Sequence, residues 1–182
     1  PGTACSAVES VLGTDLVVLI ADPTPFGLND LKLSVDMCRT LGIEPVVVVN
    51  RAEYRDGSLK NYCKEAELNI VGEIPDDRKI AEVYSDGNLA AEELDQYKEL
   101  FTILAENIFQ YAQQKREVRQ QVEPVFKKDV AVEKSITTRP KGGDKPKELV
   151  VISGKGGTGK TSLVASFASL AEETVLADCD VD

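Results

Sequence analysis

The residues with the clearest chemistry lie near the C-terminus, where Ser153–Ser162 reads SGKGGTGKTS. This segment satisfies the spacing G-x-x-x-x-G-K-[ST] through Gly154, Gly159, Lys160 and Thr161. Glycines let backbone N–H groups wrap a phosphate without Cβ atoms in the way. A lysine neutralises the β- and γ-phosphate oxygens, and a hydroxyl holds Mg²⁺. The pattern predicts a site for ATP and Mg²⁺, and a glycine-rich turn without function is the alternative.

The elements around this loop are those that a phosphate site needs. Leu149–Ser153 is a short apolar strand before the loop, and Thr174–Ala177 is a second strand. The residues between them predict a helix that opens at the loop, so that its positive N-terminal end faces the anion. Its expected buried residues are Leu163, Val164, Phe167, Leu170 and Ala171.

The first part of the chain alternates strands and helices. Asp15–Ala21 and Pro45–Asn50 are nearly all-apolar, β-branched runs, as expected of parallel strands covered on both faces. Helical spacing of apolar residues precedes Gly42, Ser58 can cap a helix to about Leu68, and Asn69–Ile74 predicts a third strand. The spacing of five residues predicts a long helix: Tyr97, Phe101, Leu104, Ile108 and Tyr111. The predicted fold class is α/β, with a mostly parallel sheet and helices on both faces.

A second lysine, Lys155, directly follows Gly154, and GKGGTGKT resembles the deviant Walker A loop of the MinD/ParA/nitrogenase-iron-protein superfamily of P-loop ATPases. The resemblance implies that Lys155 reaches the ATP of a partner subunit across a nucleotide-bound dimer. It also implies that Asp178, in the DCDVD run, joins the Mg²⁺ network and that Asp180 orients the attacking water. An exposed lysine and ordinary surface acidity are the alternatives. The implied nucleotide contacts are Gly154, Lys155, Gly156, Gly157, Thr158, Gly159, Lys160, Thr161 and Ser162.

The first part of the chain resembles the other end of the same fold, closest to the ferredoxin-containing MinD-like subgroup. Pro1–Ser6 (PGTACS) resembles the end of the segment called switch II, and Asp15–Leu31 resembles the strand and loop that follow it. The VNR and IPD runs match segments that contact adenine in that family, which implies base contacts from Asn50, Arg51, Pro75 and Asp76. An asparagine amide suits adenine because it offers both a donor and an acceptor. A turn residue is the alternative for Asn50.

The motifs therefore stand in an unusual order, with back-half features before the phosphate loop. We divide the chain into residues 1–114, the C-terminal half of an ATPase domain; 115–147, a basic flexible linker; and 148–182, an N-terminal βαβ unit. Each half would be an incomplete domain, and a piece that spans two tandem ATPase units is favoured over a circular permutant. By the resemblance, Leu149–Ser153 should pair in parallel with Asp15–Ala21, within one chain or between two.

Composition narrows the classes of partner. The net charge is −10, which argues against a broad nucleic-acid surface, although residues 115–147 hold ten Lys or Arg and five Asp or Glu. No apolar run approaches the ~20 residues that cross a bilayer, and no signal peptide is visible. Four dispersed cysteines without a CxxC pair indicate reduced thiols in the cytoplasm.

Cys5 lies in the PGTACS run near the start of the sequence. Its position resembles that of the cysteine that holds the bridging cluster in nitrogenase iron protein, and a small buried residue is the alternative. The expected function is that of a dimeric Mg-ATPase coupled to an iron–sulfur or redox process, with ATP, Mg²⁺ and a [4Fe–4S] cluster as cofactors and a ferredoxin-type partner. The alternatives are a nucleotide-dependent dimerisation or iron–sulfur scaffold without turnover, and an ATP-dependent amide-forming synthetase related to corrin biosynthesis.

Overall fold

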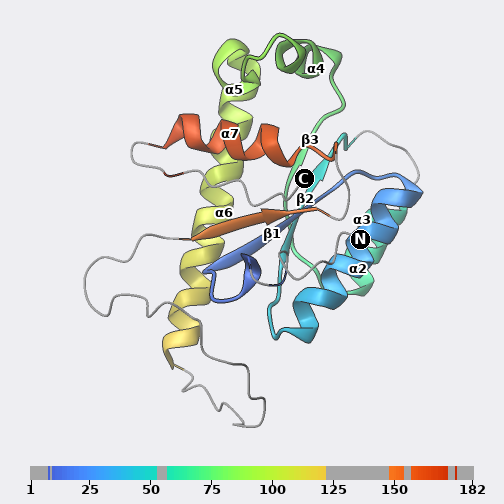
Figure 1. The fold of residues 1–182 in the computed structure, drawn as a ribbon, viewed down its shortest axis with the longest axis vertical. Helices are drawn as coiled ribbons and strands as arrows, with labels where there is room; N and C mark the ends of the chain where they lie inside the picture. The colour runs from blue at the N-terminus through green and yellow to red at the C-terminus, as the bar shows by residue number, and fades with distance from the viewer. Residues whose placement is uncertain are drawn as a thin grey trace.

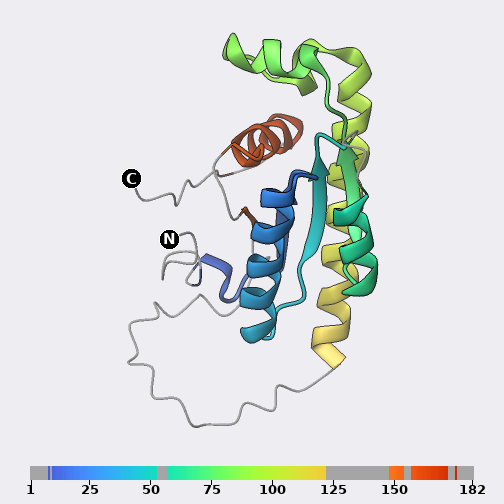
Figure 2. The same ribbon diagram turned by 90° about the vertical axis from the view of Figure 1, so that its right-hand side faces the viewer.

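Within the described residues, a four-stranded, all-parallel sheet lies at the centre, with the strand order β3-β2-β1-β4. The computed structural model describes residues 8, 10–52, 57–121, 148–153, 157–171 and 175, and for 115–121 it describes the backbone alone. The strands are β1 (Leu16–Ala21), β2 (Val46–Asn50), β3 (Ile70–Ile74) and β4 (Leu149–Ile152). Helices cover both faces of the sheet (Figure 1; Figure 2). The predicted α/β class with a parallel sheet is confirmed.

One face of the sheet is covered by α2 (Pro25–Thr40) and α3 (Ser58–Glu65). Alternate strand residues such as Val17, Leu19 and Val47 pack there in one apolar cluster with Val35 of α2 and Leu59 of α3. Because successive strand residues point to opposite faces, a strand with no polar residue must be covered on both sides.

The opposite face is covered by α6 (Asp95–Gln121) and α7 (Lys160–Leu170), with α4 (Arg78–Ser85) and α5 (Ala90–Glu93) at one end. The predicted spacing in α6 is confirmed. Tyr111 packs at the margin of the apolar cluster on this face, and the other four predicted residues are buried in it: Tyr97, Phe101, Leu104 and Ile108. The prediction for α7 was partly wrong. Leu163 is buried, but Val164, Phe167 and Leu170 are only half-buried and Ala171 is exposed. Ser166, which was not predicted to be buried, is fully buried as well.

Two boundaries also differ from the sequence prediction. α6 continues to Gln121, so the predicted linker starts seven residues too early. The run KREVRQQ is basic but consists mainly of good helix formers, and charge alone does not end a helix. In α3, Ser58 is the first helical residue and not the cap, and the helix ends at Glu65. Gly57 occupies the N-cap with φ +65, a left-handed conformation that glycine adopts at little cost.

The end of α2 agrees with the prediction. Gly42 follows the helix with φ +72, and its N–H donates to the carbonyl of Arg39 at 2.9 Å.

β4 pairs in parallel with β1 within a single chain, which confirms the predicted pairing. The register runs from Leu16 opposite Leu149 to Leu19 opposite Ile152. Just before both strands, the N–H of Asp15 donates to the carbonyl of Glu148 at 3.1 Å. This register brings the residues after β4 to the carboxyl end of β1.

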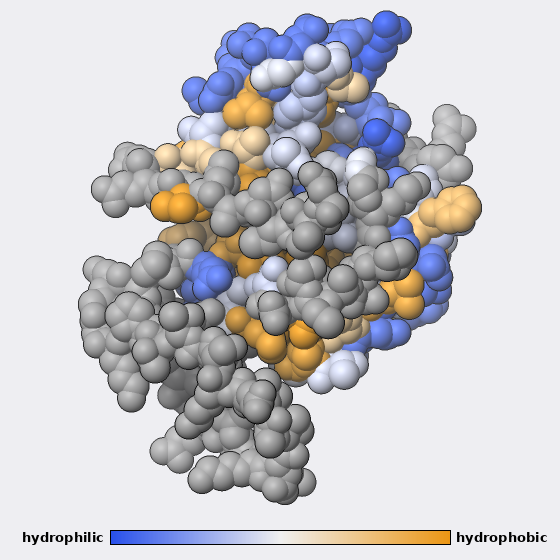
Figure 3. Space-filling view, viewed as in Figure 1, coloured by the Kyte–Doolittle hydropathy of each residue, from blue (hydrophilic) through white to orange (hydrophobic). Residues whose placement is uncertain are grey.

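The end formed by α4 and α5 is mostly hydrophilic in Figure 3, and its exposed residues include Arg78, Lys79, Glu82, Glu92 and Glu93. Within the part of the chain that the structure describes, no helix combines the length and apolarity that a membrane crossing requires.

Candidate functional site

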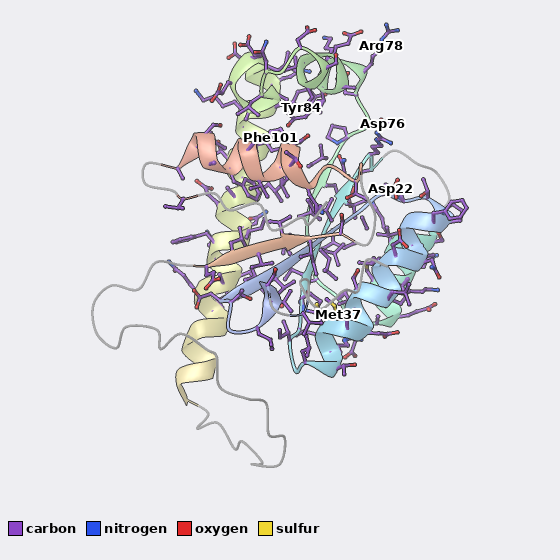
Figure 4. All side chains as sticks on the ribbon, viewed as in Figure 1. Asp22, Met37, Asp76, Arg78, Tyr84 and Phe101 are labelled. Carbon is purple, nitrogen blue, oxygen red and sulfur yellow. The ribbon has the colours of Figure 1, made fainter. Side chains whose placement is uncertain are left out.

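The candidate site lies at the carboxyl ends of the parallel strands, where ligands bind in open α/β sheets. Asp22 follows β1, Asn50 ends β2, Pro75 and Asp76 follow β3, and Ser153 follows β4. Figure 4 shows Asp22 and Asp76 at this end of the sheet, whereas Met37 lies towards the other end of α2. Parallel pairing therefore gathers residues that are far apart in the sequence.

The described part of the phosphate-loop motif has the backbone conformation that its glycines permit. Gly157 has φ +81 and Gly159 has φ +97, while the Thr158 side chain between them is only 5% exposed. The N-cap of α7 is Gly159, a residue without a side chain that could cap the helix. Since the first N–H groups of a helix have no partner within it, this terminus suits an anion.

Lys160 and Thr161 form the first turn of α7. Lys160 is half-buried and Thr161 is exposed. A hydroxyl at this position is the type of oxygen ligand that Mg²⁺ takes together with phosphate oxygens. The residues present therefore fit Mg·ATP in residue type and backbone conformation.

Asn50 links the carboxyl end of β2 to the phosphate-loop motif. Its Nδ2 donates to the carbonyl oxygen of Thr158 at 2.9 Å, and its Oδ1 accepts from the N–H of Arg51 at 3.1 Å. Of the four residues predicted to contact a base, Asn50 is thus brought to the loop. Arg51 and Asp76 are exposed and Pro75 is half-buried. The last two follow β3, which β2 and β1 separate from β4.

Tyr84 of α4 forms a second link to α7, and the sequence prediction did not include it. Its hydroxyl lies 3.4 Å from the carbonyl oxygen of Ser162 and 3.2 Å from Oγ of Ser166. Ser166 is fully buried and also donates to Ser162 O at 2.8 Å. Figure 4 shows Tyr84 where α4 approaches α7. The one available signal was the position of Ser166 three residues after Leu163, which puts both on one helix face.

A compact turn after β1 was also missed as part of the site. Oγ1 of Thr24 donates to Oδ1 of Asp22 at 3.0 Å and accepts from the N–H of Gly27 at 3.1 Å, which makes Thr24 the N-cap of α2. A Cβ at Gly27 would lie 1.9 Å from Asp22 Oδ1 and 2.2 Å from Asp22 O. Glycine is therefore required there, and the Asp22 carboxylate is held beside the carboxyl end of β1.

The two described cysteines belong to the core. Cys38 and Cys63 are no more than 1% exposed. Burial, with a smaller contribution from Glu44, raises the pKa of the Cys38 thiol to about 11, and burial raises the pKa of the Cys63 thiol to about 11. Both thiols lie within the apolar cluster on the face of the sheet that α2 and α3 cover, and they are closed off from solvent. The prediction that Cys38 is a core residue is confirmed.

Several predicted site residues lie outside the described residues: Cys5, Gly154, Lys155, Gly156, Asp178 and Asp180. The second strand predicted for the C-terminal unit, Thr174–Ala177, also falls there apart from the exposed Val175. Among the residues that the structure does describe, no group of three His, Cys, Asp or Glu side chains could hold a metal ion.

Comparison with known proteins gives one distant relative. The chain is 31% identical over 86 residues to the uncharacterized protein MJ0579 of Methanocaldococcus jannaschii. The match covers 47% of this chain and 29% of that protein, so the chain spans less than a third of its relative. No protein-family profile and no solved structure matches the chain.

Proposed function

We propose that Gly154–Ser162 binds the phosphates of Mg·ATP and that this chain is the nucleotide-binding part of a cytoplasmic MinD/ParA-type Mg-ATPase. The observation that carries the proposal is the place of the motif. It follows β4, which pairs in parallel with the buried strand β1, and it opens α7 through two glycines with positive φ. A chance glycine-rich turn has no reason to combine these features with Lys160 and Thr161 in the first helical turn.

The roles of the residues follow from their chemistry. Lys160 neutralises charge on the β- and γ-phosphates, and Thr161 contributes a hydroxyl to Mg²⁺. The metal, when bound, supplies charge neutralisation at the transferred phosphoryl group. Asp178 extends the Mg²⁺ network and Asp180 orients the attacking water. Lys155 acts on the ATP of a partner subunit, so that two copies close around nucleotide and separate after hydrolysis.

The wider function is the coupling of this ATP switch to an iron–sulfur or redox process, with a ferredoxin-type partner and without nucleic acid. Its support is the resemblance of residues 15–31 to the ferredoxin-containing subgroup. Cys5 is the residue through which a [4Fe–4S] cluster would be held. The buried, protonated thiols of Cys38 and Cys63 are not candidates for that role.

The binding test compares two lysines of one loop. We expect Lys160→Ala to weaken ADP and ATP binding by the 182-residue chain strongly, because it removes the charge that faces the phosphates. We expect Lys155→Ala to leave that affinity nearly unchanged, because its role lies across a dimer. Isothermal calorimetry measures both. Absence of nucleotide binding by the unsubstituted chain would refute the proposal, and equal losses in the two variants would refute the role of Lys155 in trans.

Hydrolysis is a separate measurement. We expect the 182-residue chain to release phosphate from ATP negligibly, because the resemblance assigns neither the Walker B aspartate nor most of switch I to any of these residues. Turnover that Lys160→Ala abolishes would contradict this expectation. In a longer protein that contains this chain, steady phosphate release would separate an ATPase from a scaffold that uses nucleotide only to dimerise.

A further inference from the structure

The amide of Asn50 makes a side-chain hydrogen bond to the phosphate-loop motif across 108 positions of sequence. Its Nδ2 lies 2.9 Å from the carbonyl oxygen of Thr158, and Asn50 is half-buried at the end of β2. The two segments belong to different parts of the chain, since β2 lies in the first part and Thr158 follows β4. The contact therefore exists only because β4 has paired with β1.

The geometry around this bond leaves the Asn50 side chain little freedom. Oδ1 accepts from the N–H of Arg51, so both polar atoms of the amide are engaged. A Cβ at position 159 would lie 2.5 Å from Nδ2 and 3.3 Å from Cγ of Asn50. Gly159 is thus needed for two reasons, its φ of +97 and the close approach of Asn50.

The bond also orients the next donor of the loop. A trans peptide is planar, so the carbonyl of Thr158 and the N–H of Gly159 belong to one rigid unit and point in opposite directions. Since Asn50 holds the carbonyl on its own side, the N–H of Gly159 points away from Asn50. Phosphate loops bind anions through such backbone N–H groups, and their orientation before binding decides how much ordering the ligand must drive.

We propose that Asn50 is a positioning residue that holds the phosphate loop through the Thr158 carbonyl and so acts on the phosphates of the ligand. The proposal rests on the proposed function, since it requires the loop to bind phosphate. It differs from the base contact that the VNR resemblance implies. In the structure one N–H of the Asn50 amide is bonded to the backbone of the loop, so Asn50 can act on the loop without any contact to a base.

The two roles predict different dependence on the base. Inorganic tripolyphosphate carries the phosphates of ATP without ribose or adenine. If Asn50 holds the loop, its removal weakens tripolyphosphate and ADP by similar factors. If Asn50 contacts adenine, its removal weakens ADP alone.

The experiment measures the affinity of the 182-residue chain for both ligands by calorimetry in the presence of Mg²⁺. We expect Asn50→Ala to weaken each ligand about three- to tenfold, the usual range for the loss of one hydrogen bond. Asn50→Asp should weaken both at least as much, because it replaces the donor by a charge that repels the carbonyl and the phosphates. The matched control is Asn107→Ala, which removes an amide bonded at 3.2 Å to the carbonyl of Val71 on β3, the strand at the opposite edge of the described sheet from β4. We expect it to change neither affinity.

The outcomes separate the two proposals. Unchanged tripolyphosphate affinity in Asn50→Ala, with or without weaker ADP binding, overturns the positioning role while leaving the phosphate site intact. Failure of the unsubstituted chain to bind either ligand overturns the proposed function instead.

A measurement on the unsubstituted chain covers the case in which Asn50→Ala does not fold. In NMR spectra we expect nuclear Overhauser contacts between the Asn50 side-chain amide and Gly159, both without ligand and with ADP. Loss of these contacts on addition of ADP would show that the amide leaves the loop for the base, and it would overturn the positioning role.

Discussion

β1 and β4 are adjacent strands of nearly the same composition, and they are buried to very different extents. Every residue of β1 is at most 3% exposed, whereas Leu149 of β4 is 39% exposed and the rest of β4 is half-buried. β1 has a neighbour on each side, and β4 lies at the edge of the described sheet. The difference teaches that apolar sequence permits burial but that position in the sheet decides how much of it occurs.

The helices repeat this contrast. α6 buries four large side chains at helical spacing, whereas the buried residues of α7 are Leu163 and Ser166. The segment with the phosphate-loop motif thus belongs to the less buried region, β4 with α7. It is held to the rest through β1, through Asn50 and Tyr84, and through Leu163, which shares an apolar cluster with Phe101.

The largest expected effect comes from the shared cluster. Phe101→Ala should lower the free energy of unfolding by about 3–5 kcal/mol, the cost of removing a fully buried aromatic ring and leaving a cavity. Both regions should lose structure in one transition, measured by circular dichroism during denaturant unfolding. Phe109→Ala, the same change at a 45% exposed position of α6, is the control and should cost much less. Survival of α7 after α6 unfolds would contradict the shared cluster.

The next effect separates the two regions. Leu163→Ala should lower the free energy of unfolding by about 2–4 kcal/mol, because Leu163 is fully buried. The value is below that for Phe101→Ala because α7 buries fewer large side chains than α6. Amide hydrogen exchange should show β4 and α7 opening before β1 and β2 do, and more so in the variant. Leu33→Ala, at a 52% exposed position of α2, should leave the pattern unchanged. If β4 amides exchange as slowly as those of β1, the contrast between the regions is wrong.

The third effect is the pH dependence of stability that arises from Cys38 on α2 and Cys63 on α3. Because burial raises the folded pKa of Cys38 and Cys63 to about 11, from an ordinary value of 9.0, the unfolded chain releases these protons first as pH rises. The stabilisation is fully present below pH 9 and is lost between pH 9 and 11. Each thiol should contribute a slope of about 1.4 kcal/mol per pH unit there. Cys63→Ala should remove the contribution of one thiol, so that the free energy of unfolding falls half as steeply between pH 9 and 11. An unchanged slope would contradict the buried, protonated thiol.

The smallest effect concerns the turn after β1. Thr24→Ala should lower the free energy of unfolding by about 1 kcal/mol, because it removes the hydroxyl that accepts from the N–H of Gly27 and donates to Asp22. Thr24→Ser keeps both groups and should restore most of the loss. Thermal unfolding of the two variants measures this effect, and equal stability of Thr24→Ala and the unsubstituted chain would show that the turn is held by its surroundings.

The sequence by itself determined the elements whose signals are local. β-branched apolar runs predicted β1 and β2, and the spacing of five aromatic and aliphatic residues predicted α6. The spacing of glycines and lysine predicted a phosphate loop, which stays a prediction. Each of these signals lies within one element, where side-chain period and backbone preference are enough. The pairing of β4 with β1 was predicted from a family resemblance, and it is confirmed.

Only the tertiary structure decided which side chains meet. Nothing near Asn50 in the sequence indicates that its amide bonds to Thr158, nor does the sequence around Tyr84 point to Ser162, 78 positions away. The sequence likewise does not indicate that Ser166 is buried, or that Asn50 comes so close to position 159 that a Cβ there would clash with it. Such contacts depend on strand order and helix placement, which arise from packing over the whole chain. A local pattern carries no information about partners at that distance.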